Sequence, residues 1–166
     1  QDDGKTWEVV GTSNGGKWPT EGRIITGRTP EQNHSDATEL LMVARNPEIG
    51  LLLTKSTDRG ATWNQAEPTG LGIMYEGLHV DGELIHMVLA DRDSGEIFST
   101  ASTFSRLWDD ATDWDPPCPL TSLDPSGAPA EQGYPDLARV DEQTLLMAAY
   151  DGENPTTDIR LWRYPG

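Results

Sequence analysis

Residues 56–63 have the spacing Ser-x-Asp-x-Gly-x-Thr-Trp, and this stretch constrains the fold of the chain more than any other feature. Asp58 can accept hydrogen bonds from nearby backbone N–H groups and so close a tight turn. Gly60 permits the positive φ that such a turn needs. Thr62 and Trp63 would begin a new strand, with the indole folded back over the turn as a hydrophobic plug. The stretch therefore predicts a β-hairpin turn with a small core of its own.

The same spacing recurs elsewhere in the chain. Asp2, Gly4 and Trp7 match it from the aspartate onward, and a weaker copy keeps Asp109 and Trp114. The aspartates at positions 2, 58 and 109 recur with a period of about 50 residues, which suits a β-propeller whose repeat is one blade of four strands. We expect the residues of these turns to be structural: Asp2, Gly4, Trp7, Ser56, Asp58, Gly60, Thr62, Trp63, Asp109 and Trp114.

These turns resemble the Asp-box, or bacterial neuraminidase repeat, of sialidases and related β-propellers. The resemblance extends beyond the turns. Residues 133–137, 144–150 and 159–163 look like the last blade of a sialidase-like propeller, and residues 80–84 with 91–92 look like the blade before it. The resemblance covers the whole chain as about three blades, whereas a complete sialidase propeller has about six.

Apolar runs and turn residues divide the chain into three blades of an all-β fold, each of four antiparallel strands. The first blade covers residues 21–69, the second 70–119 and the third 134–164, and residues 116–133 form a long connection rich in Pro, Gly and Ala. Strands are expected at residues 23–27, 39–45, 50–56 and 62–66, then at 73–80, 83–90 and 96–102, and finally at 135–140, 144–150 and 158–163.

The third blade lacks the turn and the strand with which the chain begins, so a strand within residues 1–10 could complete it. Such closure removes exposed sheet edges. Three blades alone would leave two apolar faces open, at a cost of about 25 cal/mol per Å². We expect either a homodimer whose two chains form one six-bladed ring, which is slightly favoured, or half of a longer propeller. The chain has no initiating Met, so it is expected to be processed or a fragment.

The acidic composition narrows the range of partners. A formal net charge of −16 and a pI of about 4.3 argue against nonspecific nucleic-acid binding, which needs clustered Lys and Arg. They favour a solvated acidic surface and a secreted or extracellular protein. No apolar run approaches the roughly 18 residues of a membrane span, and no signal peptide is recognisable.

Cysteine and histidine usage gives no sign of a metal or a cofactor. The single cysteine, Cys118, cannot form an internal disulfide. His34, His79 and His86 lack the spacing of metal ligands, and the sequence has no phosphate-cradling loop. We therefore expect neither a metal site nor a cofactor.

Blade topology predicts where a ligand would bind. In each blade the Asp-box turn lies at one end, and the start of the first strand and the finish of the second strand lie at the other. Residues at this other end of the three blades therefore meet at one mouth, where a ligand would bind. Arginines, carboxylates and tyrosines gather at these positions: Arg23 (or Arg28), Arg45, Tyr75, Glu76, Asp91, Arg92, Tyr134, Asp136, Tyr150, Asp151 and Glu153.

The resemblance implies roles for some of these residues. Tyr134 takes the place of the nucleophilic tyrosine of sialidases, and Glu76 that of the glutamate that activates it. Arg45, Arg92, Arg23 and Asp151 would bind the substrate, because arginine forks bind a carboxylate bidentately. Without function, Tyr134 would pack at the rim, Glu76 would be an exposed strand residue, and the arginines would pair with nearby carboxylates.

Two functions from different classes follow from this reading. One is a sialidase-like protein that acts on glycans, either an exo-glycosidase of sialosides or a degenerate relative. The other is a non-catalytic propeller for carbohydrate binding or assembly, which is favoured by the lack of a full arginine triad in the sequence. Fold does not decide between them. The discriminating feature is whether two or three arginines and Tyr134 meet in one mouth, within about 5–6 Å of one another, because bidentate carboxylate recognition requires this.

Overall fold

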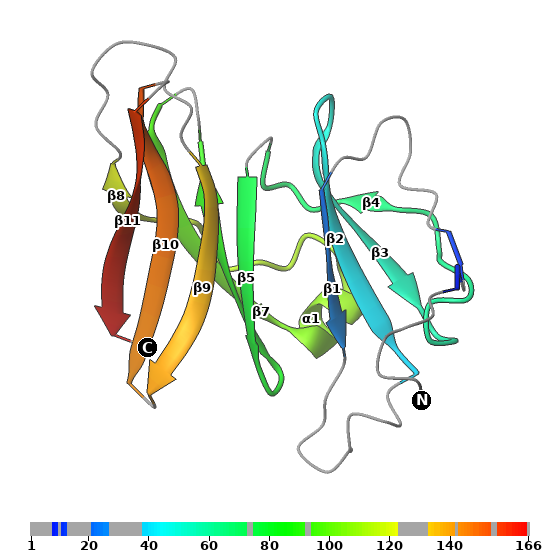
Figure 1. Cartoon of the computed structure of the whole chain (residues 1–166). Coiled ribbons are helices and arrows are strands. Elements are labelled where there is room, and N and C mark those ends of the chain that lie inside the picture. Colours follow the sequence, from blue (N-terminus) through cyan, green and yellow to red (C-terminus); the bar gives the residue numbers. More distant parts are fainter. Residues whose placement is uncertain are drawn as a thin grey trace.

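The computed structural model describes residues 8–9, 11–12, 21–26, 38–72, 75–91, 94–122, 133–141, 143–153 and 156–165. Within them the chain forms three antiparallel β-sheets and one short helix (Figure 1). The sheets follow one another along the chain and pack side by side, with the second in the middle. No helix in the described part is long and apolar enough to cross a membrane.

Each sheet is built from strands that are consecutive in the sequence. The first sheet contains β1 (Gly22–Thr26), β2 (Leu40–Asn46), β3 (Gly50–Ser56) and β4 (Glu67–Pro68). The second contains β5 (Tyr75–Asp81), β6 (Leu84–Ala90), β7 (Glu96–Thr103) and β8 (Cys118–Ser122), with α1 (Phe104–Asp109) between its last two strands. The third contains β9 (Gly133–Asp141), β10 (Thr144–Glu153) and β11 (Thr156–Pro165).

The predicted all-β class is confirmed, and most predicted strands overlap an observed one. Two predictions were wrong. The strand expected at residues 62–66 is absent, because β4 forms only at Glu67–Pro68, where it pairs with β3. The connection expected at residues 116–133 contains β8, which pairs with β7 and completes the second sheet. Both errors concern edge strands that contain few apolar residues, and such strands show little of the hydrophobic periodicity from which strands are predicted.

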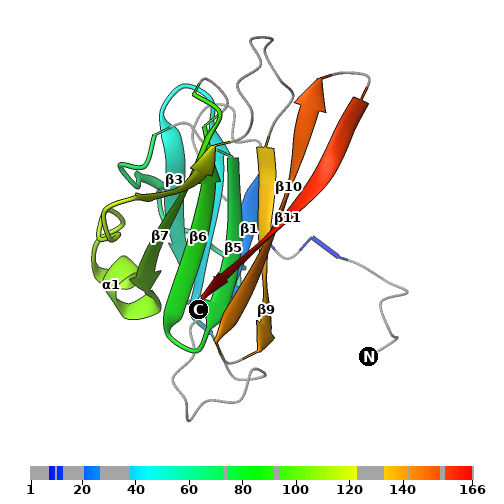
Figure 2. The ribbon, with the colours of Figure 1, turned by 90° about the vertical axis from the view of Figure 1, so that its left-hand side faces the viewer.

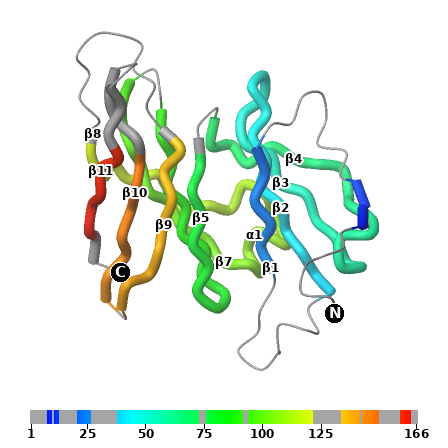
Figure 3. Tube along the Cα trace, viewed as in Figure 1, coloured from blue at the N-terminus to red at the C-terminus, as the bar shows by residue number. Residues whose placement is uncertain are grey.

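The described residues of the N-terminal segment do not pair with the third sheet. Of the strand expected there, Glu8 and Val9 are described, and neither belongs to a strand. Gly11 lies against the Gly60 and Ala61 carbonyls, in the turn that follows β3. In Figure 3 the segment of residues 8–9 and 11–12, at the blue end of the colour bar, lies on the side of the molecule away from β11. The third sheet therefore has three strands among the described residues, where the other two have four.

The second sheet lies between the other two, as Figure 1 shows and Figure 2 gives in a view turned by 90°, and it contributes buried side chains to both apolar cores. Ile85, Met87 and Leu89 of β6 point into the core that the sheet shares with the first sheet. Val88 and Ala90 of the same strand point into the core shared with the third sheet. Alternate side chains of a strand face opposite sides, so a strand between two sheets needs a nearly continuous apolar run.

The turn at residues 56–63 has the predicted geometry. Asp58 accepts hydrogen bonds from Thr62 N at 2.8 Å and from Thr62 Oγ1 at 2.6 Å. Ser56 Oγ accepts from Gly60 N at 2.9 Å, and Gly60 has a φ of 87°. Trp63 folds back and donates from Nε1 to the Gly60 carbonyl at 3.0 Å. Hydrogen bonds from Thr62 and Ser56 hold the pKa of Asp58 below its usual value.

The weaker copy of this turn has a different structure. Thr103 occupies the place of Ser56 at the end of its strand, but it caps α1 instead of closing a turn. Asp109 ends this helix, so its predicted role in the turn was wrong. Asp110 takes that role, since it accepts from Thr112 N at 2.8 Å and from Thr112 Oγ1 at 2.7 Å. Trp114 is buried in the core between the first two sheets, as a plug should be. The third copy, at Asp2, Gly4 and Trp7, lies outside the described residues.

Gly77 sets how closely β5 and β9 approach. A Cβ atom at this position would lie 2.7 Å from Asp136 Cα and closer still to the Pro135 carbonyl oxygen. Both obstacles are backbone atoms, which cannot rotate away. Any side chain at position 77 would therefore push the third sheet away from the second.

We expect Gly77→Ala to destabilise the protein by about 1–3 kcal/mol, because the backbone of β9 must shift to make room. Gly22→Ala is the matched control, since its Cβ would meet Val43 O at 3.6 Å and Met42 Sδ at 3.7 Å, which are ordinary contacts. Urea unfolding of the two variants and the parent measures the difference. Equal stability of both variants would contradict the close contact at Gly77.

Candidate functional site

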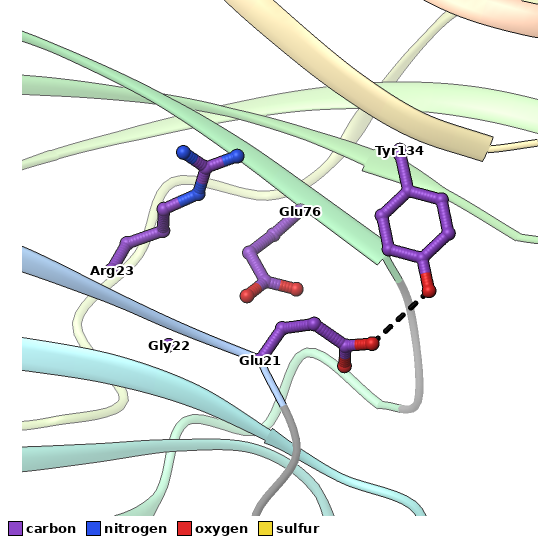
Figure 4. Close-up of a pocket in the computed structure, with 5 residues that line it drawn as sticks. All are labelled: Glu21, Gly22, Arg23, Glu76 and Tyr134. Carbon is purple, nitrogen blue, oxygen red and sulfur yellow. Dashed lines mark hydrogen bonds between the residues drawn. The ribbon is translucent and has the colours of Figure 1, made fainter.

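One pocket lies where strands from all three sheets begin (Figure 4). It has a volume of about 310 Å³ and is lined by Glu21, Gly22, Arg23, Glu76 and Tyr134. The first three precede or begin β1, Glu76 lies near the start of β5, and Tyr134 lies near the start of β9. The structure thus brings together three residues that the sequence placed at one mouth, namely Arg23, Glu76 and Tyr134.

Tyr134 owes its position to an irregularity in β9. Gly133 pairs with Tyr150 and Asp136 pairs with Ala148, so two residues of β9 oppose one residue of β10. Such a bulge redirects a side chain, and it tolerates a proline, which has no N–H for the sheet. Tyr134 has a φ of 45°, which is uncommon for a residue with a side chain and costs about 1–3 kcal/mol. Its side chain is about half exposed and directed into the pocket.

The hydroxyl of Tyr134 donates a hydrogen bond to Glu21 Oε1 at 3.0 Å. The activating glutamate was predicted to be Glu76, so the observed partner of the phenol is a residue that the sequence analysis missed. Glu21 immediately precedes β1, and the only available signal was its acidic side chain at a position where the mouth was expected. The two partners are 113 residues apart, and nothing local in the sequence links them.

Arg45 holds Glu21 in place. Its Nε lies 2.8 Å from Glu21 Oε2 and its Nη2 lies 3.3 Å from Glu21 Oε1, while its backbone N donates to the Glu21 carbonyl at 2.9 Å. The side chain of Arg45 is 13% exposed and that of Glu21 is 41% exposed. A paired and largely buried guanidinium is worth more than a surface ion pair and fixes the carboxylate geometry. Arg45 and Arg92 were expected to pair with Asp91, Asp93 or Glu48 if they bound no substrate; Arg45 is observed to pair with Glu21.

Glu76 is buried, with a relative exposure of 6%, and was wrongly expected to be an exposed strand residue unless it had a function. Its Oε1 has no hydrogen-bond partner among the described residues. Burial, with a smaller contribution from the negative charge of Glu21, raises the pKa of Glu76 to about 7, against the opposing charges of Arg23 and Arg45. Near neutral pH this side chain can therefore either give or take a proton.

The other predicted site residues are distributed as follows. Asp91 accepts a hydrogen bond from Ser94 Oγ at 2.9 Å in the turn between β6 and β7. Asp136 is exposed, and its Oδ1 accepts from Leu137 N at 3.0 Å. Arg28 and Arg92 lie outside the described residues. Four further residues belong to β5 and β10, with side chains outside the described part: Tyr75, Tyr150, Asp151 and Glu153.

The described residues contain no group of three or more His, Cys, Asp or Glu side chains that could hold a metal ion. The pocket contains four functional groups. They are the phenol of Tyr134, the carboxylate of Glu21 that is hydrogen-bonded to it, the carboxyl group of Glu76 with a pKa of about 7, and the guanidinium of Arg23. Such groups can carry out nucleophilic attack and proton transfer.

We expect Glu76→Gln to stabilise the protein at pH 8 and to have little effect at pH 4. The folded protein holds a proton on Glu76 up to a pKa of about 7, whereas an unfolded chain releases it near 4.5. Stability from this group is therefore lost as the pH rises from about 4.5 to 7. The gain in the variant at pH 8 is up to about 3 kcal/mol. Urea unfolding at both pH values measures it, with the exposed Glu48→Gln as control; a gain that does not depend on pH would contradict the raised pKa.

No protein-family model matches the chain. No curated protein matches it either. Among solved structures, it is similar to the crystal structure of a protein of unknown function from Dyadobacter fermentans DSM 18053, with a TM-score of 0.65 and 16% sequence identity. The similarity covers 87% of this chain and 37% of that chain, so this chain spans little more than a third of that protein's length. At this identity the similarity extends to the fold alone.

Proposed function

We propose that the pocket acts on glycans as a sialidase-like glycoside hydrolase, with Tyr134 as the nucleophile and Glu21 as the acceptor of its proton. The observation that carries this proposal is the 3.0 Å hydrogen bond from the Tyr134 hydroxyl to Glu21 Oε1. It lies in a pocket that also contains Glu76 and Arg23. Sialidases are the glycosidases that use a tyrosine nucleophile.

The chemistry of the pair explains why both residues are needed. A free phenol has a pKa of about 10 and is a weak nucleophile at neutral pH. A carboxylate within hydrogen-bond distance removes the proton as the phenol oxygen attacks the anomeric carbon. Arg45 is the positioning residue that keeps Glu21 aimed at the phenol. The left-handed backbone of Tyr134 is strain of the kind that clusters at functional sites.

Arg23 is our candidate for binding the carboxylate of a sialoside, because a guanidinium fork binds a carboxylate with two hydrogen bonds. Arg45 is already bound to Glu21, so it would support the site without binding the ligand directly. Arg92 and Asp151 remain proposed substrate-binding residues on the resemblance alone. Local arginines are needed in such a site because the chain as a whole carries a net charge of −16.

We further propose that the three sheets are blades of an Asp-box β-propeller and that a second copy completes a six-bladed ring. Consecutive strand order in every sheet supports this architecture. Apolar side chains also remain exposed at both ends of the row of sheets: Ile24 in β1 is 61% exposed, and Ile159 and Leu161 in β11 are 70% and 62% exposed. Each would be covered if the first sheet of one copy packed against the third sheet of the other.

The alternative is a non-catalytic propeller that binds carbohydrate. The observation that favours it is the bidentate pair between Arg45 and Glu21, which occupies one of the arginines expected to bind a substrate carboxylate. A binding site would need the shape and the polar groups of this pocket but no nucleophile.

We expect the parent protein to release 4-methylumbelliferone from its sialoside and Tyr134→Phe to lower kcat by about 100-fold or more, because phenylalanine has no oxygen to attack with. Fluorescence in a continuous assay measures the rate. Tyr164→Phe is the matched control, since its backbone pairs with Leu145 at the other end of β10. Equal activity of parent and Tyr134→Phe would remove Tyr134 as the nucleophile, and binding of the sialoside without turnover by the parent would favour the alternative.

We expect light scattering after size exclusion to give a mass near twice the 18.2 kDa of the chain. Covering the exposed apolar side chains of both end sheets is the physical reason. A variant with Ile159→Lys and Leu161→Lys should have the mass of a single chain, because charges on this face oppose its burial. A monomeric parent would contradict the ring of two chains.

A further inference from the structure

We infer that Glu76 is the acid that protonates the leaving oxygen in the reaction proposed for this pocket, so that the two glutamates have separate tasks. The inference rests on the proposed function. Glu21 is partly exposed and bound to both Tyr134 and Arg45. Glu76 is buried, and one of its oxygens has no hydrogen-bond partner among the described residues. An acid for a leaving group must be free to donate, and Glu76 is the carboxyl group of the two with an unused oxygen.

The position of Glu76 suits contact with a substrate. Its carboxyl group projects into the pocket between the side chains of Arg23 and Glu21, and Tyr134 lies beyond Glu21 (Figure 4). A sugar that contacts both Arg23 and Tyr134 would therefore pass over Glu76. Gly77, the next residue of β5, is packed against the backbone of Pro135, which follows Tyr134. This contact fixes the distance between β5, which carries Glu76, and β9, which carries Tyr134.

The electrostatic surroundings couple the two proton transfers. The negative charge of Glu21 contributes to the raised pKa of Glu76 and so helps to keep it protonated before the reaction. When the proton of Tyr134 moves to Glu21, that negative charge disappears, and the pKa of Glu76 falls. Glu76 thus becomes a stronger acid at the step in which it must donate, while the positive charges of Arg23 and Arg45 remain to stabilise its carboxylate.

The complete reaction conserves atoms and charge. In the first step the Tyr134 oxygen bonds to the anomeric carbon, its proton passes to Glu21, the glycosidic bond breaks, and Glu76 gives its proton to the leaving alcohol. In the second step water attacks the anomeric carbon, Glu76 takes a proton from the water, and the bond to Tyr134 breaks. The phenol then recovers its proton from Glu21. The sugar is released with retained configuration after two displacements.

The test compares two sialosides with leaving groups of different quality. In 3′-sialyllactose the leaving group is a hydroxyl oxygen of lactose, which needs a proton to leave. In the 4-methylumbelliferyl sialoside the leaving group is a phenol, which can leave without one. We expect Glu76→Gln to lower kcat/KM for sialyllactose by about 100-fold or more and for the phenolic substrate by less than about tenfold. Glu21→Gln should lower both to a similar extent, because it acts on the nucleophile. Glu48→Gln, an exposed residue of the turn between β2 and β3, serves as control.

The pH profile gives a second readout. In the parent, kcat/KM for sialyllactose should fall above pH 7, where Glu76 loses its proton. With the phenolic substrate, whose leaving group needs no proton, neither the parent nor Glu76→Gln should show this decline. Equal losses for both substrates in Glu76→Gln would overturn the assignment of the acid and leave the proposed function standing. A parent that hydrolyses neither sialoside would overturn the proposed function, and the assignment with it.

Discussion

The contact between β5 and β9 at Gly77 is the constraint on which the site depends. The absence of a side chain lets the Pro135 carbonyl and Asp136 Cα lie directly against β5. Glu76 and Tyr134 flank this contact, one on each strand. The hydroxyl of Tyr134 then reaches across to Glu21 at the start of the first sheet. If β5 and β9 lay further apart, the carboxyl groups of Glu21 and Glu76 and the phenol of Tyr134 would not line one pocket.

The second sheet makes this arrangement rigid, because it is the shared wall of two cores. Alternate residues of β6 contribute to each core, as Met87 and Val88 illustrate. A further link joins the first two sheets at the end opposite the pocket, where Lys55 Nζ donates to the Trp108 carbonyl at 2.6 Å. The pocket residues are thus carried on strands whose spacing is set by close-packed side chains, as a preorganised site requires.

Two glutamates in one cavity differ because their surroundings differ. Glu21 is held by Arg45 and accepts a hydrogen bond from Tyr134. Glu76 is removed from water, and desolvation, more than any neighbouring charge, raises its pKa to about 7. Two titratable groups whose surroundings give them different pKa values usually have separate roles as acid and base. Neither residue type nor sequence neighbours distinguish the two, so only their burial and contacts do.

The sequence by itself determined the features that depend on local chemistry. Asp58, Gly60 and Trp63 form the predicted turn because its hydrogen bonds join residues only a few positions apart. The alternation of apolar residues likewise placed most strands and the all-β class, because side-chain direction follows the strand period. Even the gathering of Arg23, Glu76 and Tyr134 followed from knowing which ends of the strands meet.

Only the tertiary structure decided which side chains touch. It paired Tyr134 with Glu21 in place of Glu76, bound Arg45 to Glu21, and buried Glu76. It also placed Asp109 at the end of α1, gave the role of that aspartate in the weaker turn to Asp110, and packed Gly11 against the turn that follows β3. The physical reason is that such contacts depend on how closely whole sheets approach. That distance is set by packing across the molecule, at Gly77 above all, and no short stretch of sequence encodes it.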